Sequence, residues 1–215
     1  MKSVTLAYLI AYNLLQWLGW LSIGVMMAVH LVQNDGNHRE LFNAVELPLV
    51  LLQASGILET IHSILGISKS SPAAAFMQYL GRGFALFLVT RSIPGVRYEL
   101  GVVSYLITWV MIDSVRYPYY FMSLLGKPPY ILTWLRYTSF IPLYPLGYLA
   151  ELTTVYAAML KVWETNQYSF TVAGTEINFY YLLLSYMAFS CFGFFQNYSY
   201  MFSQRKKALK KAKTN

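Results

Sequence analysis

Cysteine and charge are both scarce in this chain. Of its 215 residues only Cys191 is a cysteine, and only 12% are Asp, Glu, Lys or Arg. A single cysteine excludes a disulfide within the chain and a multi-cysteine metal site. Because Cys191 lies in an apolar segment, we expect it to be a small buried residue. A soluble domain carries about twice this charged fraction, so the composition argues against an ordinary soluble domain.

Long apolar runs take the place of the missing charge. The sequence is 57% hydrophobic, and a membrane-spanning helix needs roughly 20 apolar residues. The runs predict about six spans, near residues 6–31, 47–67, 73–89, 101–125, 130–162 and 179–202. Only helices and closed barrels satisfy backbone polar groups in lipid, and runs of this length are not barrel strands. We therefore predict an all-α, polytopic transmembrane helical bundle over residues 1–203, followed by a basic cytosolic tail at 204–215.

The fifth apolar run is too long for one straight span. It contains Pro142, Pro145 and Gly147, residues that kink or interrupt helices. The run predicts either a kinked helix or a short interfacial helix followed by a span, and a seven-span count stays open. Because proline suits the first turn of a helix, Tyr144 is expected at or just before a helix start.

Positive charge is concentrated at the C-terminus. The net charge is +7, and the segment after Ser203 holds six basic residues and no acidic one. A basic cluster next to a last apolar helix marks the cytoplasmic side and contacts anionic lipid. We therefore expect both termini in the cytosol and no nucleic-acid partner, although two arginines in the loop at 91–99 fall on the opposite side. Lys211 and Lys213 also fit the Lys-x-Lys-x-x pattern of endoplasmic-reticulum retrieval, which a lysine-rich tail also matches by chance.

Several ionisable side chains fall inside the predicted spans. They are Glu59, His62, Arg82, Asp113, Arg116, Arg136 and Glu151. A charge at the centre of a membrane helix costs about 2.5–3.5 kcal/mol, so we expect these residues to face the bundle interior and to pair. Glu59 with His62, and Asp113 with Arg116, are three residues apart and share a helix face. A structural polar clamp and a functional site both fit this pattern. Arg82 and Arg136 would also suit a position at the headgroup boundary.

The stretch LYPLGYLAEL, residues 143–152, keeps a carboxylic acid in an apolar run. Seven residues rotate a helix through about 700°, so Tyr144 and Glu151 share one face within about 20°. An apolar pocket favours the neutral form of a glutamic acid. Tyr144 could be the second proton-transfer group, the more so if Arg136 or Arg116 stabilised its phenolate. The pair predicts an acid/base site, such as one that eliminates water next to a carbonyl.

The spacing of this pair sets a geometric condition. Two Cα atoms seven residues apart in a straight helix are separated by about 10.5 Å. The side chains of Tyr144 and Glu151 must therefore converge, or the backbone must bend at Pro145 and Gly147. The small residues Gly147 and Ala150 would also let another helix or a substrate chain come close.

From Leu135 onward the sequence resembles the 3-hydroxyacyl-CoA dehydratase family, also known as protein-tyrosine-phosphatase-like A proteins. Leu-Arg-Tyr at 135–137 is followed by Leu-Tyr-Pro-x-Gly-x-x-x-Glu at 143–151. Further matches are Tyr12, Asn13, Gly19, Trp20, Gln53, residues 58–62, Gly66, Gln78, Arg82, Asp113, Arg116, Tyr117 and the QRKKALKK tail. Each match is weak alone, but their order and spacing along most of the chain are specific.

The resemblance implies an endoplasmic-reticulum membrane enzyme of very-long-chain fatty acid elongation. Its reaction is the third step of the cycle, in which a (3R)-3-hydroxyacyl-CoA loses water to give the trans-2-enoyl-CoA. The family's catalytic residues fall on Tyr144 and Glu151, and the other intramembrane ionisable residues are candidates for supporting roles. No metal or redox cofactor is implied. The expected partners are the long-chain 3-hydroxyacyl-CoA substrate, membrane lipid, and the elongase and reductases of the cycle.

The acid and base roles stay open in the sequence. One hypothesis is that Tyr144 takes the C2 proton while Glu151 protonates the departing hydroxyl. Three positions depart from the family pattern: Asp113 replaces the usual glutamate, Gly81 a serine and Ser71 a proline. These departures keep a non-catalytic membrane scaffold open as an alternative, and a small transporter is a third candidate. A phosphatase is excluded because the single cysteine has no arginine six positions further on.

Overall fold

Helices form nearly all of the structure, a computed structural model that describes residues 3–68, 71–172 and 174–213. The four longest are α1 (Ser3–Gln33), α5 (Leu100–Leu125), α7 (Phe140–Thr165) and α8 (Phe179–Lys213). The shorter ones are α2 (Leu41–Ser55), α3 (Ile57–Ile64), α4 (Pro72–Gly83), the π-helix η1 (Phe84–Thr90), the 3₁₀ turn η2 (Pro94–Val96) and α6 (Tyr130–Arg136). The prediction of an all-α bundle is confirmed.

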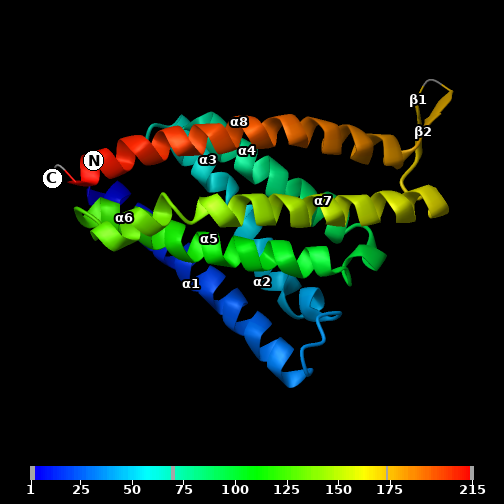
Figure 1. Ribbon diagram of the computed structural model, residues 1–215, viewed down its shortest axis with the longest axis horizontal. Coiled ribbons are helices and arrows are strands. Elements are labelled where there is room, and N and C mark those ends of the chain that lie inside the picture. The colour runs from blue at the N-terminus through cyan, green and yellow to red at the C-terminus, as the bar shows by residue number, and fades with distance from the viewer. Residues whose placement is uncertain (1–2, 69–70, 173, 214–215) are drawn as a thin grey trace.

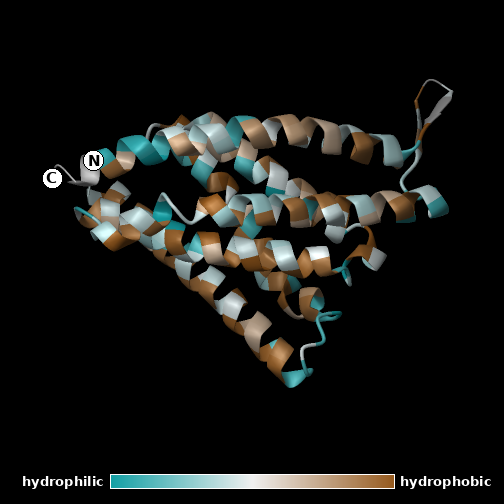
Figure 2. Ribbon diagram, in the orientation of Figure 1, coloured by the Kyte–Doolittle hydropathy of each residue, from teal (hydrophilic) through white to brown (hydrophobic). Residues whose placement is uncertain are grey.

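Four helical segments are long and apolar enough to cross a membrane. They are Ser3–Gln33, Leu41–Ile64, Pro72–Thr90 and Phe179–Lys210, and they correspond to the first, second, third and sixth predicted spans. The other two predicted spans are α5 and α7, which have 26 residues each and reach about 39 Å, but are less apolar. Figure 2 shows hydrophilic residues at the α1–α2 loop and at the C-terminal end of α8. The chain is a multi-pass membrane protein.

Helix α5 lies at the centre of the bundle, between α1 and α7 (Figure 1). Both chain ends lie at one end of the bundle, together with α6, and a small β-hairpin projects from the opposite end. Termini on the same side agree with the even number of spans predicted from the sequence.

The fifth apolar run divides into the short helix α6 and the long helix α7, which is the second of the two predicted arrangements. Helix α7 begins at Phe140, so Tyr144 lies in the second turn and the expectation that it marks the helix start is wrong. Pro145 has no N–H to donate to the carbonyl of Ile141. The hydroxyl of Tyr198 on α8 donates to that carbonyl instead, at 3.0 Å, so a partner helix supplies the hydrogen bond that proline removes.

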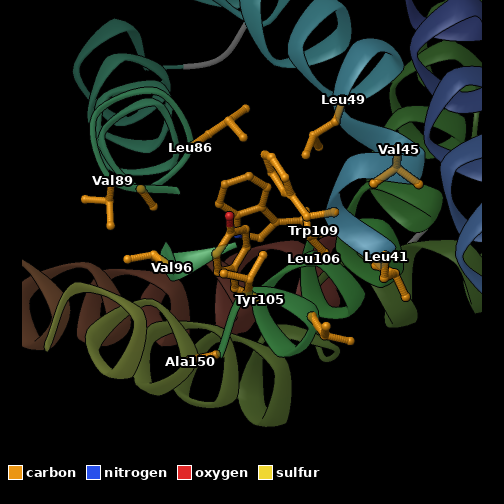
Figure 3. Packing of buried hydrophobic residues seen from close by; sticks show 14 of the residues in the cluster. Leu41, Val45, Leu49, Leu86, Val89, Val96, Tyr105, Leu106, Trp109 and Ala150 are labelled. Atoms are coloured by element: carbon orange, nitrogen blue, oxygen red, sulfur yellow. The ribbon is translucent and has the colours of Figure 1, made fainter. Parts of the chain in front are cut away.

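Small residues bring α5 and α7 close together, as expected for Gly147. A Cβ atom on Gly147 would lie 2.8 Å from Thr108 Oγ1, and one on Gly101 would lie 2.5 Å from Thr154 Oγ1. Both distances are shorter than real Cβ contacts, so a larger residue fits at either position only if neighbouring atoms shift. Figure 3 shows the aromatic side chains of α5 packed among aliphatic residues of α2 and η1.

Two features differ from the sequence analysis. The connector after α7 forms an antiparallel hairpin of β1 (Phe170–Val172) and β2 (Thr175–Ile177), which was not predicted. Cys191 is exposed rather than buried, because α8 packs on the bundle through one face only. The last two residues of the proposed retrieval pattern, 214–215, and the lysine side chains of that pattern lie outside the described residues, so the pattern stays a prediction.

Candidate active site

Tyr144 and Glu151 lie two turns apart on the unbroken helix α7. Because the helix continues between them, it does not end at Pro145 or Gly147, and the regular spacing of about 10.5 Å applies to the two Cα atoms. The two side chains contact different neighbours, Glu151 on α5 and Tyr144 on α8. The phenol and the carboxylate are nevertheless close enough to interact electrostatically.

Glu151 is held from helix α5. The indole N–H of Trp109 donates a hydrogen bond to Glu151 Oε1 at 2.9 Å. The guanidinium of Arg82 lies over the Trp109 ring, 4.9 Å from its centroid, and is close enough to interact electrostatically with Glu151. The buried Trp109 N–H therefore fixes one carboxylate oxygen of Glu151, and the positive charge of Arg82 lies on the Trp109 ring nearby.

Tyr144 faces helix α8. Its ring stacks on Phe194, with centroids 5.2 Å apart and planes at 6°, and on Tyr198 at 5.9 Å and 13°. The side chain of Asn197 is within hydrogen-bonding reach of the phenol. Stacked rings on one helix and an amide on the same helix set the direction of this hydroxyl.

Neither Arg136 nor Arg116 meets the condition of stabilising the Tyr144 phenolate, because both have other partners. Arg136 donates to the hydroxyl of Tyr120 at 3.1 Å and lies over that ring, because the short helix α6 packs against the C-terminal part of α5. Arg116 pairs instead with Glu59 of α3 at 3.0 Å. The groups that act on the Tyr144 phenol are Asn197 and Glu151.

Four charged residues form a chain of alternating sign through the bundle. Arg82 Nη1 lies 2.5 Å from Asp113 Oδ2, Asp113 Oδ1 lies 3.0 Å from Arg116 Nε, and Arg116 Nη2 lies 3.0 Å from Glu59 Oε1. The Asp113 side chain is completely buried. The predicted pairing of Asp113 with Arg116 is confirmed, and Arg82 pairs in the interior rather than lying at a headgroup boundary.

Glu59 and His62 lie on one helix, α3, but have different partners. Glu59 accepts a hydrogen bond from the Tyr117 hydroxyl at 2.5 Å, whereas His62 Nε2 bonds to the Tyr8 hydroxyl at 2.9 Å. The shared face predicted from their spacing does not make them a pair. Both residues anchor α3 to neighbouring helices, and neither contacts Tyr144 or Glu151 in the described structure.

Sequence reasoning missed Trp109, Asn197 and Tyr186 at this site. The spacing of Trp109 and Asp113, four apart on one face of α5, was a usable signal, because a polar face at Asp113 extends to Trp109 one turn away. Tyr186 of α8 interacts electrostatically with both Glu151 and Tyr144 and stacks on Phe84 at 3.7 Å. Nothing in the sequence distinguishes it from the other tyrosines.

The part of the chain that the structure describes has no group of three or more His, Cys, Asp or Glu side chains placed to hold a metal ion. The chemistry available at Tyr144 and Glu151 is proton transfer. Trp109, Arg82 and Asn197 are placed to orient these two groups.

The comparison with known proteins assigns the family. The family profile for protein tyrosine phosphatase-like protein, PTPLA, matches residues 53–211. The chain belongs to this family. It is 37% identical over 210 residues to very-long-chain (3R)-3-hydroxyacyl-CoA dehydratase 2 of Mus musculus, covering 96% of this chain and 82% of the relative.

Two further relatives carry the same activity in their names. Very-long-chain (3R)-3-hydroxyacyl-CoA dehydratase 1 of Canis lupus familiaris is 35% identical over 205 residues, covering 94% of this chain and 82% of the relative. Very-long-chain (3R)-3-hydroxyacyl-CoA dehydratase hpo-8 of Caenorhabditis elegans is 36% identical over 210 residues, covering 94% of this chain and 94% of the relative. A search of the solved structures found no match.

Proposed function

We propose that this chain is a very-long-chain (3R)-3-hydroxyacyl-CoA dehydratase, a hydro-lyase that forms the trans-2-enoyl-CoA of the elongation cycle. The observation that carries the proposal is a tyrosine and a glutamate on one face of α7, inside a multi-pass bundle whose relatives bear this name. The endoplasmic-reticulum membrane is the proposed location, with the elongase and reductases of the cycle as partners.

The surroundings of the two groups favour Glu151 as the base, the reverse of the hypothesis stated from the sequence. Glu151 receives the Trp109 N–H and lies near Arg82, and both groups stabilise the carboxylate form, which acts as the base, against the effect of burial. Tyr144 lies among aromatic rings, and among the described residues the groups that act on its phenol are Asn197 and Glu151 rather than a cation. A neutral phenol is the form that donates a proton, and the Asn197 amide stabilises the phenolate that remains.

The reaction balances with these two groups alone. The Glu151 carboxylate takes the proton from C2, and the electrons of that C–H bond form the C2=C3 double bond. The C3–O bond breaks, and the hydroxyl leaves as water with the proton of Tyr144. Glu151 then holds one proton more and Tyr144 one fewer, and transfer through solvent or the nearby Tyr186 phenol restores both.

The test is dehydration of a long-chain (3R)-3-hydroxyacyl-CoA by purified protein in lipid nanodiscs. Tyr144→Phe and Glu151→Gln should each lower kcat at least about a hundredfold, the typical contribution of a positioned acid or base. Tyr156→Phe and Glu164→Gln are matched controls, because both residues are exposed on the same helix.

The same experiment distinguishes a dehydratase from the alternative, a non-catalytic scaffold. A folded wild type that makes no enoyl product would overturn the dehydratase proposal and favour the scaffold. Wild-type activity that survives in both Tyr144→Phe and Glu151→Gln would keep the reaction but remove these residues from it.

A further inference from the structure

A recess lies between α6 and the C-terminal end of α8. It is lined by Tyr130, Trp134, Arg205, Leu209 and Lys210. The two helices contact each other there, at the end of the bundle that also holds both chain termini (Figure 1). Neither proton-transfer residue nor any member of the buried charge chain lines this recess.

The lining combines exposed aromatic rings with basic groups. Tyr130 is 50% exposed and Trp134 is 38% exposed, so both rings present surface to a ligand. Nucleobases stack on such rings, whereas guanidinium and ammonium groups bind phosphate. A ligand that satisfies both kinds of group carries an aromatic base and phosphates, as a nucleotide does.

Arg205 is the best-placed phosphate ligand in the recess. Its Nε lies 3.4 Å from Thr138 Oγ1, in the segment between α6 and α7, which directs the side chain toward α6. It is half-buried, and it forms no ion pair with a described carboxylate. The positive charge of Arg205 therefore remains available to an anionic ligand.

The distance from the recess to Tyr144 matches a substrate arm. Tyr144 stacks on Tyr198 of α8, and Arg205 and Lys210 follow on the same helix at about 10 and 18 Å along its axis. The pantetheine arm of coenzyme A is as long as about four amino-acid residues and reaches about 15 Å when extended. A thioester at Tyr144 would therefore bring its nucleotide end between Arg205 and Lys210.

We propose that this recess binds the 3′-phospho-ADP end of the acyl-CoA substrate, with Arg205 and Lys210 at the phosphates and Trp134 or Tyr130 against the adenine. The proposal rests on the dehydratase function. It assigns specificity for the coenzyme A carrier to residues of α6 and α8 rather than to the proton-transfer groups on α7.

The test compares two substrates with the same acyl chain, a (3R)-3-hydroxyacyl-CoA and the corresponding pantetheine thioester, which lacks the nucleotide. For the CoA substrate, Arg205→Gln should raise KM about tenfold, in line with loss of a charge-assisted hydrogen bond. The same variant should change KM for the pantetheine thioester less than about twofold, because that substrate does not reach the recess. Lys206→Gln is the matched control, since Lys206 is an exposed cation on the same turn that does not line the recess.

An equal change of KM for both substrates, or an equal effect of Lys206→Gln, would overturn the proposal. A wild type that dehydrates neither substrate would refute the function instead. In that case the nucleotide site is tested separately, by binding of adenosine 3′,5′-bisphosphate to the protein in nanodiscs of zwitterionic lipid. Binding that weakens about tenfold in Arg205→Gln supports the recess, and no binding overturns it. A dependence on Arg205 that appears only with phosphatidylserine present would identify a lipid headgroup site and also overturn the proposal.

Discussion

Replacing Asp113 by asparagine should destabilise the bundle more than any other single charge removal considered for this chain. Asp113 is completely buried between two arginines, 2.5 Å from Arg82 Nη1 and 3.0 Å from Arg116 Nε. Asparagine keeps the shape but leaves the two guanidinium groups without the carboxylate between them, so that only Glu59 beside Arg116 and Glu151 near Arg82 still compensate them. Removing one member of a buried ion pair costs about 3–5 kcal/mol, because a buried charge is left unpaired.

Glu46 supplies a matched control for this prediction. It also lies between two arginines, 3.0 Å from Arg91 Nε and 3.7 Å from Arg97 Nη1, but its side chain is 26% exposed. Exposed ion pairs contribute about 0–1 kcal/mol, so Glu46→Gln should change the free energy of unfolding by no more than that. Asp113→Glu keeps the charge and adds one methylene, for which overpacking predicts a cost of about 1–3 kcal/mol.

The assay is reversible unfolding in mixed micelles titrated with sodium dodecyl sulfate. The predicted loss for Asp113→Asn, about 4 kcal/mol, lowers the ratio of folded to unfolded protein roughly a thousandfold. The reasoning is refuted if Asp113→Asn and Glu46→Gln lower the free energy of unfolding equally, or if Asp113→Glu is the more damaging change.

Four further substitutions, of which Gly193→Ala is a control, test local parts of the structure. Trp109→Phe removes the donor to Glu151 but keeps an aromatic ring, so kcat for dehydration should fall about tenfold with KM nearly unchanged, and a change in KM alone would contradict a positioning role. Gly147→Val adds carbon atoms that point at α5, where a Cβ alone would lie 2.8 Å from the Thr108 hydroxyl. It should lower the free energy of unfolding in micelles by about 1–3 kcal/mol. Gly193→Ala, which meets no atom within 4 Å, should cost much less. Tyr198→Phe leaves a helix carbonyl without its donor and should destabilise by about 1 kcal/mol, and no loss would show that water replaces the hydroxyl.

Features set by spacing along one helix could be predicted from the sequence. The period of the apolar runs located the helices, and the three-residue spacing of Asp113 and Arg116 predicted their contact. The same rule placed Tyr144 and Glu151 on one helix face, since seven residues are close to two turns, but it left open whether the helix bends between them.

Features that depend on contacts between helices could not be predicted. Pro145 indicated a helix start, but the Tyr198 hydroxyl satisfies the carbonyl that the proline leaves open, so the helix begins one turn earlier. The Trp109 donor to Glu151 joins residues 42 positions apart, and no local pattern relates them. The partner of Arg136 was unpredictable for the same reason, because tertiary packing directs it to Tyr120 rather than to Tyr144.

The central claim is that Tyr144 and Glu151 act together in one elimination step. Single-turnover rates of (3R)-3-hydroxyacyl-CoA dehydration for Tyr144→Phe, Glu151→Gln and the double variant test it most directly. Groups that serve the same transition state give losses far from additive, so the double variant should be about as slow as the slower single variant. Losses that multiply in the double variant, or a single variant that retains the wild-type rate, would contradict the account.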